Sequence, residues 1–173
     1  NVVGLVQRHV TRDEASVGGK RGWNELSGCD TEVSQIGSLS CYDVELPEPR
    51  RMLSDEGMKF LSVPVWTDTK NADQRVRICS QARAIENECY VAIAGSVGNL
   101  PRVKNMDIQY AQSAVFTPCD FSFPTTGVKR AATPNTEMLL VTAVAPSHPH
   151  NPPPRARGQY TRAPPHEPHS PHA

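Results

Sequence analysis

Residues 39–48 read Leu39-Ser40-Cys41-Tyr42-Asp43-Val44-Glu45-Leu46-Pro47-Glu48. A short apolar run with one glycine, residues 36–40, leads into this stretch and is typical of a buried strand. Residues 48–58 then read as a helix, because Glu48 suits the positive helix end, proline is tolerated in the first turn and Gly57 suits the C-terminal cap. The stretch therefore predicts a strand, a tight turn that carries Cys41, and a helix that begins within a few residues.

The same alternation continues along the chain. An amphipathic helix is predicted over residues 72–87, where apolar side chains recur at helical spacing. Further strands are predicted at four apolar runs, residues 60–65, 89–95, 113–117 and 138–144. Strands that alternate with helices and are followed by more strands predict an α/β layered domain.

Composition excludes several classes of protein. Lys plus Arg and Asp plus Glu each number 18 in 173 residues, so the net charge is zero, whereas a nucleic-acid binder carries a concentrated basic excess. Apolar runs stay well below the roughly 20 residues that cross a bilayer. The first ten residues lack the features of a secretory signal. We therefore expect a cytoplasmic protein with neither nucleic acid nor membrane as a partner.

The five cysteines are odd in number, widely spaced and without a C-x-x-C pair. This spacing predicts neither a zinc site nor a disulfide framework, and no metal or cofactor is expected. Four of the cysteines read as small buried apolar side chains. Cys41 differs, because a thiol at the start of a helix forms the nucleophilic thiolate more easily and has backbone N–H groups nearby that can stabilise an oxyanion.

The composition changes sharply near Val144. The segment after it holds nine of the 16 prolines and five of the six histidines. Such a segment cannot bury enough apolar area to offset its ordering entropy. We therefore predict a domain over residues 1–144 and a disordered tail over residues 145–173.

Three motifs in the expected order resemble the nitrilase superfamily of carbon–nitrogen hydrolases. CYDVELPE at residues 41–48 is similar to the family's nucleophile motif, commonly CYD-x-x-FPE. PVWTDTKNADQRVRICSQARAIENECYVAIAGSVGNLP at residues 64–101 resembles the segment that follows the nucleophile, and residues 110–118 resemble a later serine-containing strand. The resemblance covers residues 6–144. It implies a nitrilase-type α-β-β-α sandwich, of which this chain supplies about the second half.

The resemblance also implies an activity. Family members hydrolyse non-peptide C–N bonds of small amides, carbamoyl compounds or nitriles through a cysteine thioester, with a glutamate as general base and a lysine at the oxyanion. By this resemblance Cys41 is the nucleophile, the backbone N–H of Tyr42 is an oxyanion donor and Glu14 is a supporting glutamate. The resemblance also implies that Trp66 forms a wall of the substrate-binding pocket and that Arg83 and Glu86 form a structural ion pair. It further implies that the protein is a homo-oligomer.

Two catalytic groups depart from the family pattern. The position of the lysine is occupied by Gln7, and the general-base glutamate belongs to the family's N-terminal half, which residues 1–173 do not include. The chain as written is therefore expected to hydrolyse amides and nitriles negligibly. Two alternatives stay open: a non-catalytic remnant that only binds or oligomerises, and a partial or frame-shifted gene product.

Overall fold

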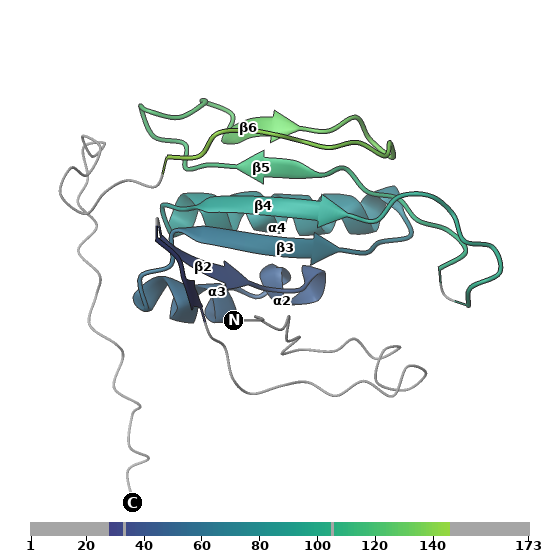
Figure 1. The fold of residues 1–173 in the computed structure, drawn as a ribbon, viewed down its shortest axis with the longest axis horizontal. Helices are drawn as coiled ribbons and strands as arrows, with labels where there is room; N and C mark the ends of the chain where they lie inside the picture. The colour runs from purple at the N-terminus through teal and green to yellow at the C-terminus, as the bar shows by residue number, and fades with distance from the viewer. Residues whose placement is uncertain (1–27, 33, 105, 146–173) are drawn as a thin grey trace, which may run out of the picture.

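The computed structural model describes residues 28–145, apart from Val33 and Asn105. These residues form a mixed six-stranded sheet whose strands lie side by side in the order of the sequence (Figure 1). The three central strands are parallel, and the outer pairs are antiparallel. The strands are β1 (Cys29–Asp30), β2 (Gln35–Ser38), β3 (Phe60–Val65), β4 (Tyr90–Gly95), β5 (Ala114–Phe116) and β6 (Val128–Ala131).

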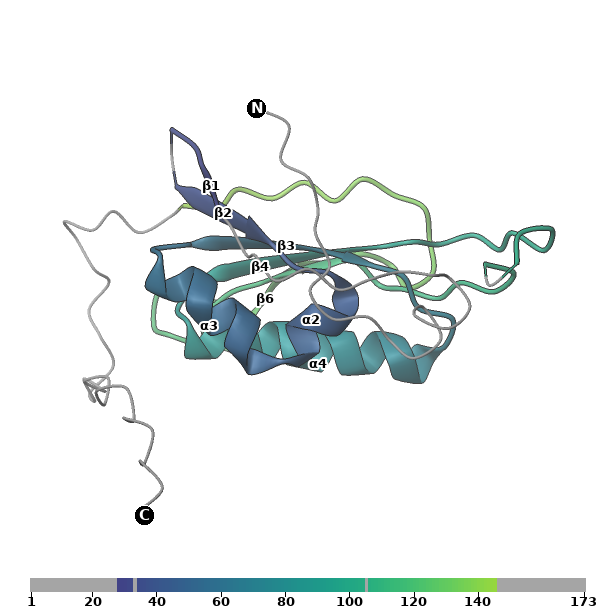
Figure 2. The same cartoon turned by 90° about the horizontal axis from the view of Figure 1, so that it is seen from below.

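Three helices lie on one face of this sheet: α2 (Cys41–Glu45), α3 (Pro47–Asp55) and α4 (Lys70–Glu86) (Figure 2). Helices α2 and α3 connect β2 to β3, and α4 connects β3 to β4. Crossovers between parallel strands are right-handed, and here both crossovers add the next strand in the same direction across the sheet. Their connecting helices therefore lie on the same face of the sheet. The predicted α/β layering is confirmed, as one sheet with one layer of helices.

The core lies between the sheet and the helices. Side chains along β3 alternate in burial, and Leu61, Val63 and Val65 on the helix side are at most 4% exposed. They pack with a cluster of buried residues that includes Leu53 and Met58. This alternation is the period of two that a half-covered strand requires.

Gly57 ends α3 as the sequence predicts. Its φ of 101° lies in the left-handed region that glycine adopts without strain. The N–H of Met58 donates to the carbonyl of Leu53 at 3.1 Å, and the N–H of Gly57 donates to that of Ser54 at 3.0 Å. These two bonds form a Schellman motif, which satisfies carbonyls at the end of the helix.

Two details of the predicted elements are wrong. Helix α2 begins at Cys41 itself, so the cysteine lies inside a helical turn and not in a turn before the helix. Residues 138–144 form no strand, and Leu139 and Val141 are 85% and 71% exposed. This segment runs over the sheet face opposite the helices (Figure 2), where it cannot form ladder hydrogen bonds, which lie in the plane of the sheet.

Several predictions fall outside the described residues. These are Gln7 at the lysine position, Glu14 as the supporting glutamate, and all but the first residue of the predicted tail over residues 145–173. Within residues 28–145, no helix is both long enough and apolar enough to span a bilayer.

Candidate functional site

The parallel strands β2, β3 and β4 end at the same edge of the sheet, so the segments that follow them lie together at that edge. The N–H of Leu39, just after β2, donates to the carbonyl of Ser62 at 3.1 Å. The N–H of Ser96, just after β4, donates to the carbonyl of Val65 at 2.9 Å. In α/β proteins ligands bind outside the carboxyl ends of such strands. The candidate site therefore lies where Cys41 follows β2 and Trp66 follows β3.

Pro64 shapes this edge from inside the sheet. The carbonyl of Ser62 faces β2, and backbone groups two residues apart along a strand face the same side. The nitrogen of Pro64 therefore points past the end of β2, which stops at Ser38. A proline has no N–H to donate to the ladder. It is tolerated in this strand because its nitrogen faces the side of β2 at a point where β2 has already ended.

Cys41 is the first residue of α2 and is partly buried. Its Sγ lies 3.9 Å from the carbonyl oxygen of Trp66, to which the thiol donates. This contact joins the segments after β2 and β3. The structure thus brings together the nucleophile and the pocket-wall residue that the resemblance names, with Trp66 37% exposed.

The first turn of α2 is held by buried polar contacts. The hydroxyl of Ser40, the N-cap residue, donates to Oδ2 of Asp43 at 2.9 Å, and Asp43 is fully buried. The N–H of Val44 donates to the carbonyl of Ser40 at 3.1 Å. Tyr42 is the second residue of the helix, so its N–H has no acceptor within the helix. Tyr42 follows Cys41 directly, so this N–H lies in the same first helical turn as the thiol.

The segment after β3 is tied to the long connection between β4 and β5. The hydroxyl of Thr67 donates to the carbonyl of Tyr110 at 2.6 Å, and the N–H of Tyr110 donates to the carbonyl of Thr67 at 2.9 Å. Gln109 is 4% exposed, its side-chain amide donates to the carbonyl of Gly98 at 2.7 Å, and its N–H donates to Oδ1 of Asn99 at 3.0 Å. The connection is therefore anchored beside the site.

Helix α4 holds the end of the same connection through the backbone of Gln112. Oδ1 of Asp73 accepts its N–H at 3.0 Å, and the guanidinium of Arg77 donates to its carbonyl. Burial raises the pKa of Asp73, and the bond from Gln112 and the charge of Arg77 oppose that rise. Arg77 also lies 5.5 Å above the ring of Phe116, a cation–π distance. The contacts of the Gln112 backbone thus fix the end of the connection between β4 and β5 against α4.

Gly95, the last residue of β4, allows this connection to pass close to the sheet. A Cβ at this position would lie 2.2 Å from Cβ of Ala111. We expect Gly95→Ala to lower the free energy of unfolding by about 1–3 kcal/mol, the usual cost of overpacking. Urea denaturation measured by circular dichroism checks the value.

The matched control for Gly95→Ala removes the opposing methyl group. The double variant Gly95→Ala/Ala111→Gly should recover part of the lost stability, because the clash between the two Cβ atoms is gone. Equal stability of Gly95→Ala and the unmodified chain would show that residues 95 and 111 do not approach closely in solution.

The sequence predicts one ion pair of this region and misses another. Arg83 Nε and Glu86 Oε1 lie 2.9 Å apart, which confirms the predicted pair. Arg75 Nε and Glu45 Oε1 also lie 2.9 Å apart and join α4 to α2. The sequence signal for the second pair is weak, since 30 residues separate its members.

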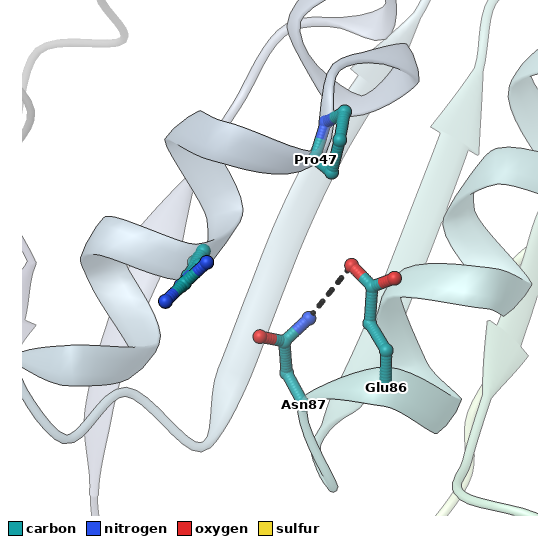
Figure 3. A pocket seen from close by; sticks show the side chains of 4 residues that line it. Pro47, Glu86 and Asn87 are labelled. Carbon is teal, nitrogen blue, oxygen red and sulfur yellow. Dashed lines mark hydrogen bonds between the residues drawn. The ribbon is translucent and has the colours of Figure 1, made fainter. Parts of the chain in front are cut away.

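A cavity of about 300 Å³ lies between the start of α3 and the end of α4 (Figure 3). It is lined by Pro47, Arg51, Glu86 and Asn87, and the side-chain amide of Asn87 donates to Glu86 at 3.1 Å within it. Its lining does not include the candidate nucleophile, so it is separate from the candidate site. Among residues 28–145, no group of His, Cys, Asp and Glu side chains could hold a metal ion.

The chain matches one family model and is similar to several curated proteins. Residues 3–145 match the model of the carbon–nitrogen hydrolase family. A probable hydrolase of Bacillus subtilis, YhcX, is 43% identical over 133 residues, which are 77% of this chain and 26% of the relative. Deaminated glutathione amidase of Yersinia enterocolitica is 34% identical over 42% of this chain and 26% of its own length.

Solved structures show the same fold. Nit3 of Saccharomyces cerevisiae, a member of the nitrilase superfamily, superposes with a TM-score of 0.58 at 20% identity, over 70% of this chain and 41% of Nit3. A mutant amidase from Nesterenkonia sp. AN1, in which acrylamide has added to the active-site cysteine, has a TM-score of 0.50 at 25% identity. That match covers 66% of this chain and 42% of the amidase. The chain thus spans about a quarter of the first curated relatives and about two-fifths of the solved chains.

Proposed function

The chain belongs to the carbon–nitrogen hydrolase family of the nitrilase superfamily, and from this membership we propose that it carries the nucleophile half of a thiol-dependent hydrolase. The substrate class is a small amide, carbamoyl compound or nitrile. The observation that supports this proposal best is the placement of Cys41, at the first turn of a helix on the carboxyl edge of three parallel strands.

The proposed reaction with an amide has two stages. Sγ of Cys41 attacks the carbonyl carbon while its proton passes to a general base, and the backbone N–H of Tyr42 donates to the developing oxyanion. The tetrahedral intermediate collapses, the C–N bond breaks, and ammonia or an amine leaves with the proton returned by that base. Water then attacks the thioester and releases the acid and the free thiol. Trp66 is the proposed wall of the substrate pocket.

The family's general base and oxyanion lysine have no matching residue in residues 1–173, and their part in the reaction comes from the resemblance alone. The resemblance assigns the lysine position to Gln7 and the supporting glutamate to Glu14. Glutamine at that position is the observation that keeps a second function open, in which the domain binds or oligomerises without turnover. A glutamine side chain offers a hydrogen bond but no positive charge to the oxyanion.

The test of the proposed nucleophile uses acrylamide, which has added to the active-site cysteine in the mutant Nesterenkonia amidase. In the addition, the sulfur bonds to the β-carbon of acrylamide and the thiol proton ends on the α-carbon. With limiting acrylamide, we expect Cys41 to acquire the adduct before the other four cysteines. Peptide mass spectrometry measures the adduct on each cysteine separately.

Cys119 is the matched reference thiol, because it is exposed and lies away from the candidate site in the connection between β5 and β6. Cys41→Ala should abolish the fast adduct and leave the slow reaction of Cys119 unchanged. Faster reaction at Cys119 than at Cys41 would refute the assignment of the nucleophile.

A further inference from the structure

Helix α2, which carries the proposed nucleophile, has only five residues. A helix this short does not hold its shape through its own hydrogen bonds. Its start is fixed by the Ser40–Asp43 contact, and the N–H of Leu46, just past its end, donates to the carbonyl of Asp43 at 3.2 Å. The position of the helix end relative to α4 therefore depends on contacts of its side chains.

Glu45 makes such a contact at the end of the helix. It lies four residues after Cys41, so the two side chains share one face of α2. Its Oε1 accepts from Nε of Arg75, on the second turn of α4, at 2.9 Å. The side chain of Glu45 is 15% exposed and that of Arg75 is 61% exposed. The pair thus ties the face that carries Cys41 to α4.

The charges of Glu45 and Arg75 interact electrostatically with nearby cysteine side chains. The pKa of Arg75 is above its ordinary value, first because of its bond to Glu45 and then because of the charge of Glu45, with smaller contributions from Cys41 and Cys79. Burial raises the pKa of the Cys79 thiol, Glu45 adds to the rise, and Arg83 and Arg75 oppose it. Arg75 and Glu45 therefore act with opposite sign on the same small cluster.

We propose that Glu45 and Arg75 are a positioning pair for Cys41, which fixes the helix that carries the sulfur and balances the charge beside it. The inference rests on the proposed function, in which Cys41 is the nucleophile. An ion pair with one exposed member contributes little to global stability. Its effect is local, because the pair links the helix of the nucleophile to the longest helix of the structure described here.

Within the described residues, two helices place charged and titratable groups near Cys41. Helix α2 contributes Asp43, which is buried and bonded to Ser40, and Glu45. Helix α4 contributes Arg75 and Cys79. Glu45 and Arg75 form an ion pair with each other, so each of them can be neutralised while Asp43 keeps its contact with Ser40.

The experiment measures the rate of acrylamide addition to Cys41 against pH in the full chain, for the unmodified protein, Arg75→Gln, Glu45→Gln and the double variant. A removed positive charge disfavours the thiolate and a removed negative charge favours it. We expect Arg75→Gln to raise the pH of half-maximal rate by about half a unit and to slow addition about threefold at pH 7. Glu45→Gln should lower that pH by a similar amount, and the double variant should lie near the unmodified protein.

Arg75→Lys is the conservative control and should keep the unmodified pH profile, since it retains the charge. The rate at Cys119 in the same samples should not change. Shifts of the two single variants in the same direction, or no shift in either, would overturn the positioning role, because a loosened structure does not distinguish the sign of the charge. If the unmodified chain reacts at another cysteine first, the proposed function itself fails.

Discussion

A chimera that supplies the catalytic groups implied by the family resemblance is expected to hydrolyse small amides about 10²–10³-fold faster with Gln7→Lys than with Gln7. In this chimera the preceding half of a family member, with its general-base glutamate, is joined ahead of Val2. By the resemblance, a lysine at position 7 supplies a positive charge to the oxyanion, and the loss of one oxyanion donor typically costs a factor of that size. Ammonia release from a panel of small amides measures the effect.

The unmodified chain should remain near the background of the assay. A general base contributes about 10²–10⁴-fold, and catalytic groups that act as a unit do not contribute additively. Cys41→Ala in the repaired chimera is the control and should abolish turnover. Ready turnover by the unmodified chain would mean that the catalytic base and the oxyanion cation are supplied by residues other than those the resemblance implies.

Arg50→Leu is expected to stabilise the protein by about 1–4 kcal/mol. The side chain of Arg50, on α3, is fully buried, and among residues 28–145 the group that its guanidinium contacts is the Cys89 thiol and not a carboxylate. A buried charge without a paired partner costs several kcal/mol, whereas an apolar side chain gains from the same burial. For a domain of this size, each kcal/mol raises the melting temperature by about 2–8 °C.

The next residue provides the matched control for Arg50→Leu. Arg51 has the same charge on the same helix but is exposed, so Arg51→Leu should change the free energy of unfolding by less than about 0.5 kcal/mol. Burial raises the pKa of the neighbouring Cys89 thiol, and the charge of Arg50 opposes that rise. A loss of stability in Arg50→Leu would therefore show that the contact between the buried guanidinium and the Cys89 thiol is favourable on balance.

The sequence predicts the elements whose signals are local. The strand at residues 60–65 agrees with β3 to the residue, because its alternating apolar side chains and the turn signals after it define both ends. Helix α4 begins two residues before the predicted start, at a Thr69 cap that accepts the N–H of Ala72 at 3.3 Å. Gly57 predicts the end of α3, since only a left-handed residue closes that helix in this way.

The features that sequence reasoning misses depend on contacts between distant segments. Strand β6 reads Val-Lys-Arg-Ala, without an apolar run, and forms by pairing with β5. Residues 138–144 have the apolar pattern of a strand, yet their path over the sheet face provides no ladder partner. The Glu45–Arg75 pair similarly requires α2 to lie against α4, which no local pattern encodes.

For the candidate site, the motif around Cys41 correctly predicts a strand followed within a few residues by a helix, but it places Cys41 in a turn before the helix, whereas α2 begins at Cys41. The structure adds the contact with Trp66 and the anchoring of residues 109–112, both of which arise from the sheet order. The roles of Cys41, Tyr42 and Trp66 stay predictions until the chemistry is measured. Those of Gln7 and Glu14 also stay predictions, since both positions fall outside the described residues.

The order of the strands in space has a consequence for how the chain assembles during synthesis. Within the described residues, each strand from β2 to β6 pairs with the strand made immediately before it. A growing chain can therefore extend the sheet at its newest edge, without waiting for a distant segment to close a long loop. The three parallel strands beside Cys41 are complete once β4 has been made, so the later antiparallel strands join a template that already exists.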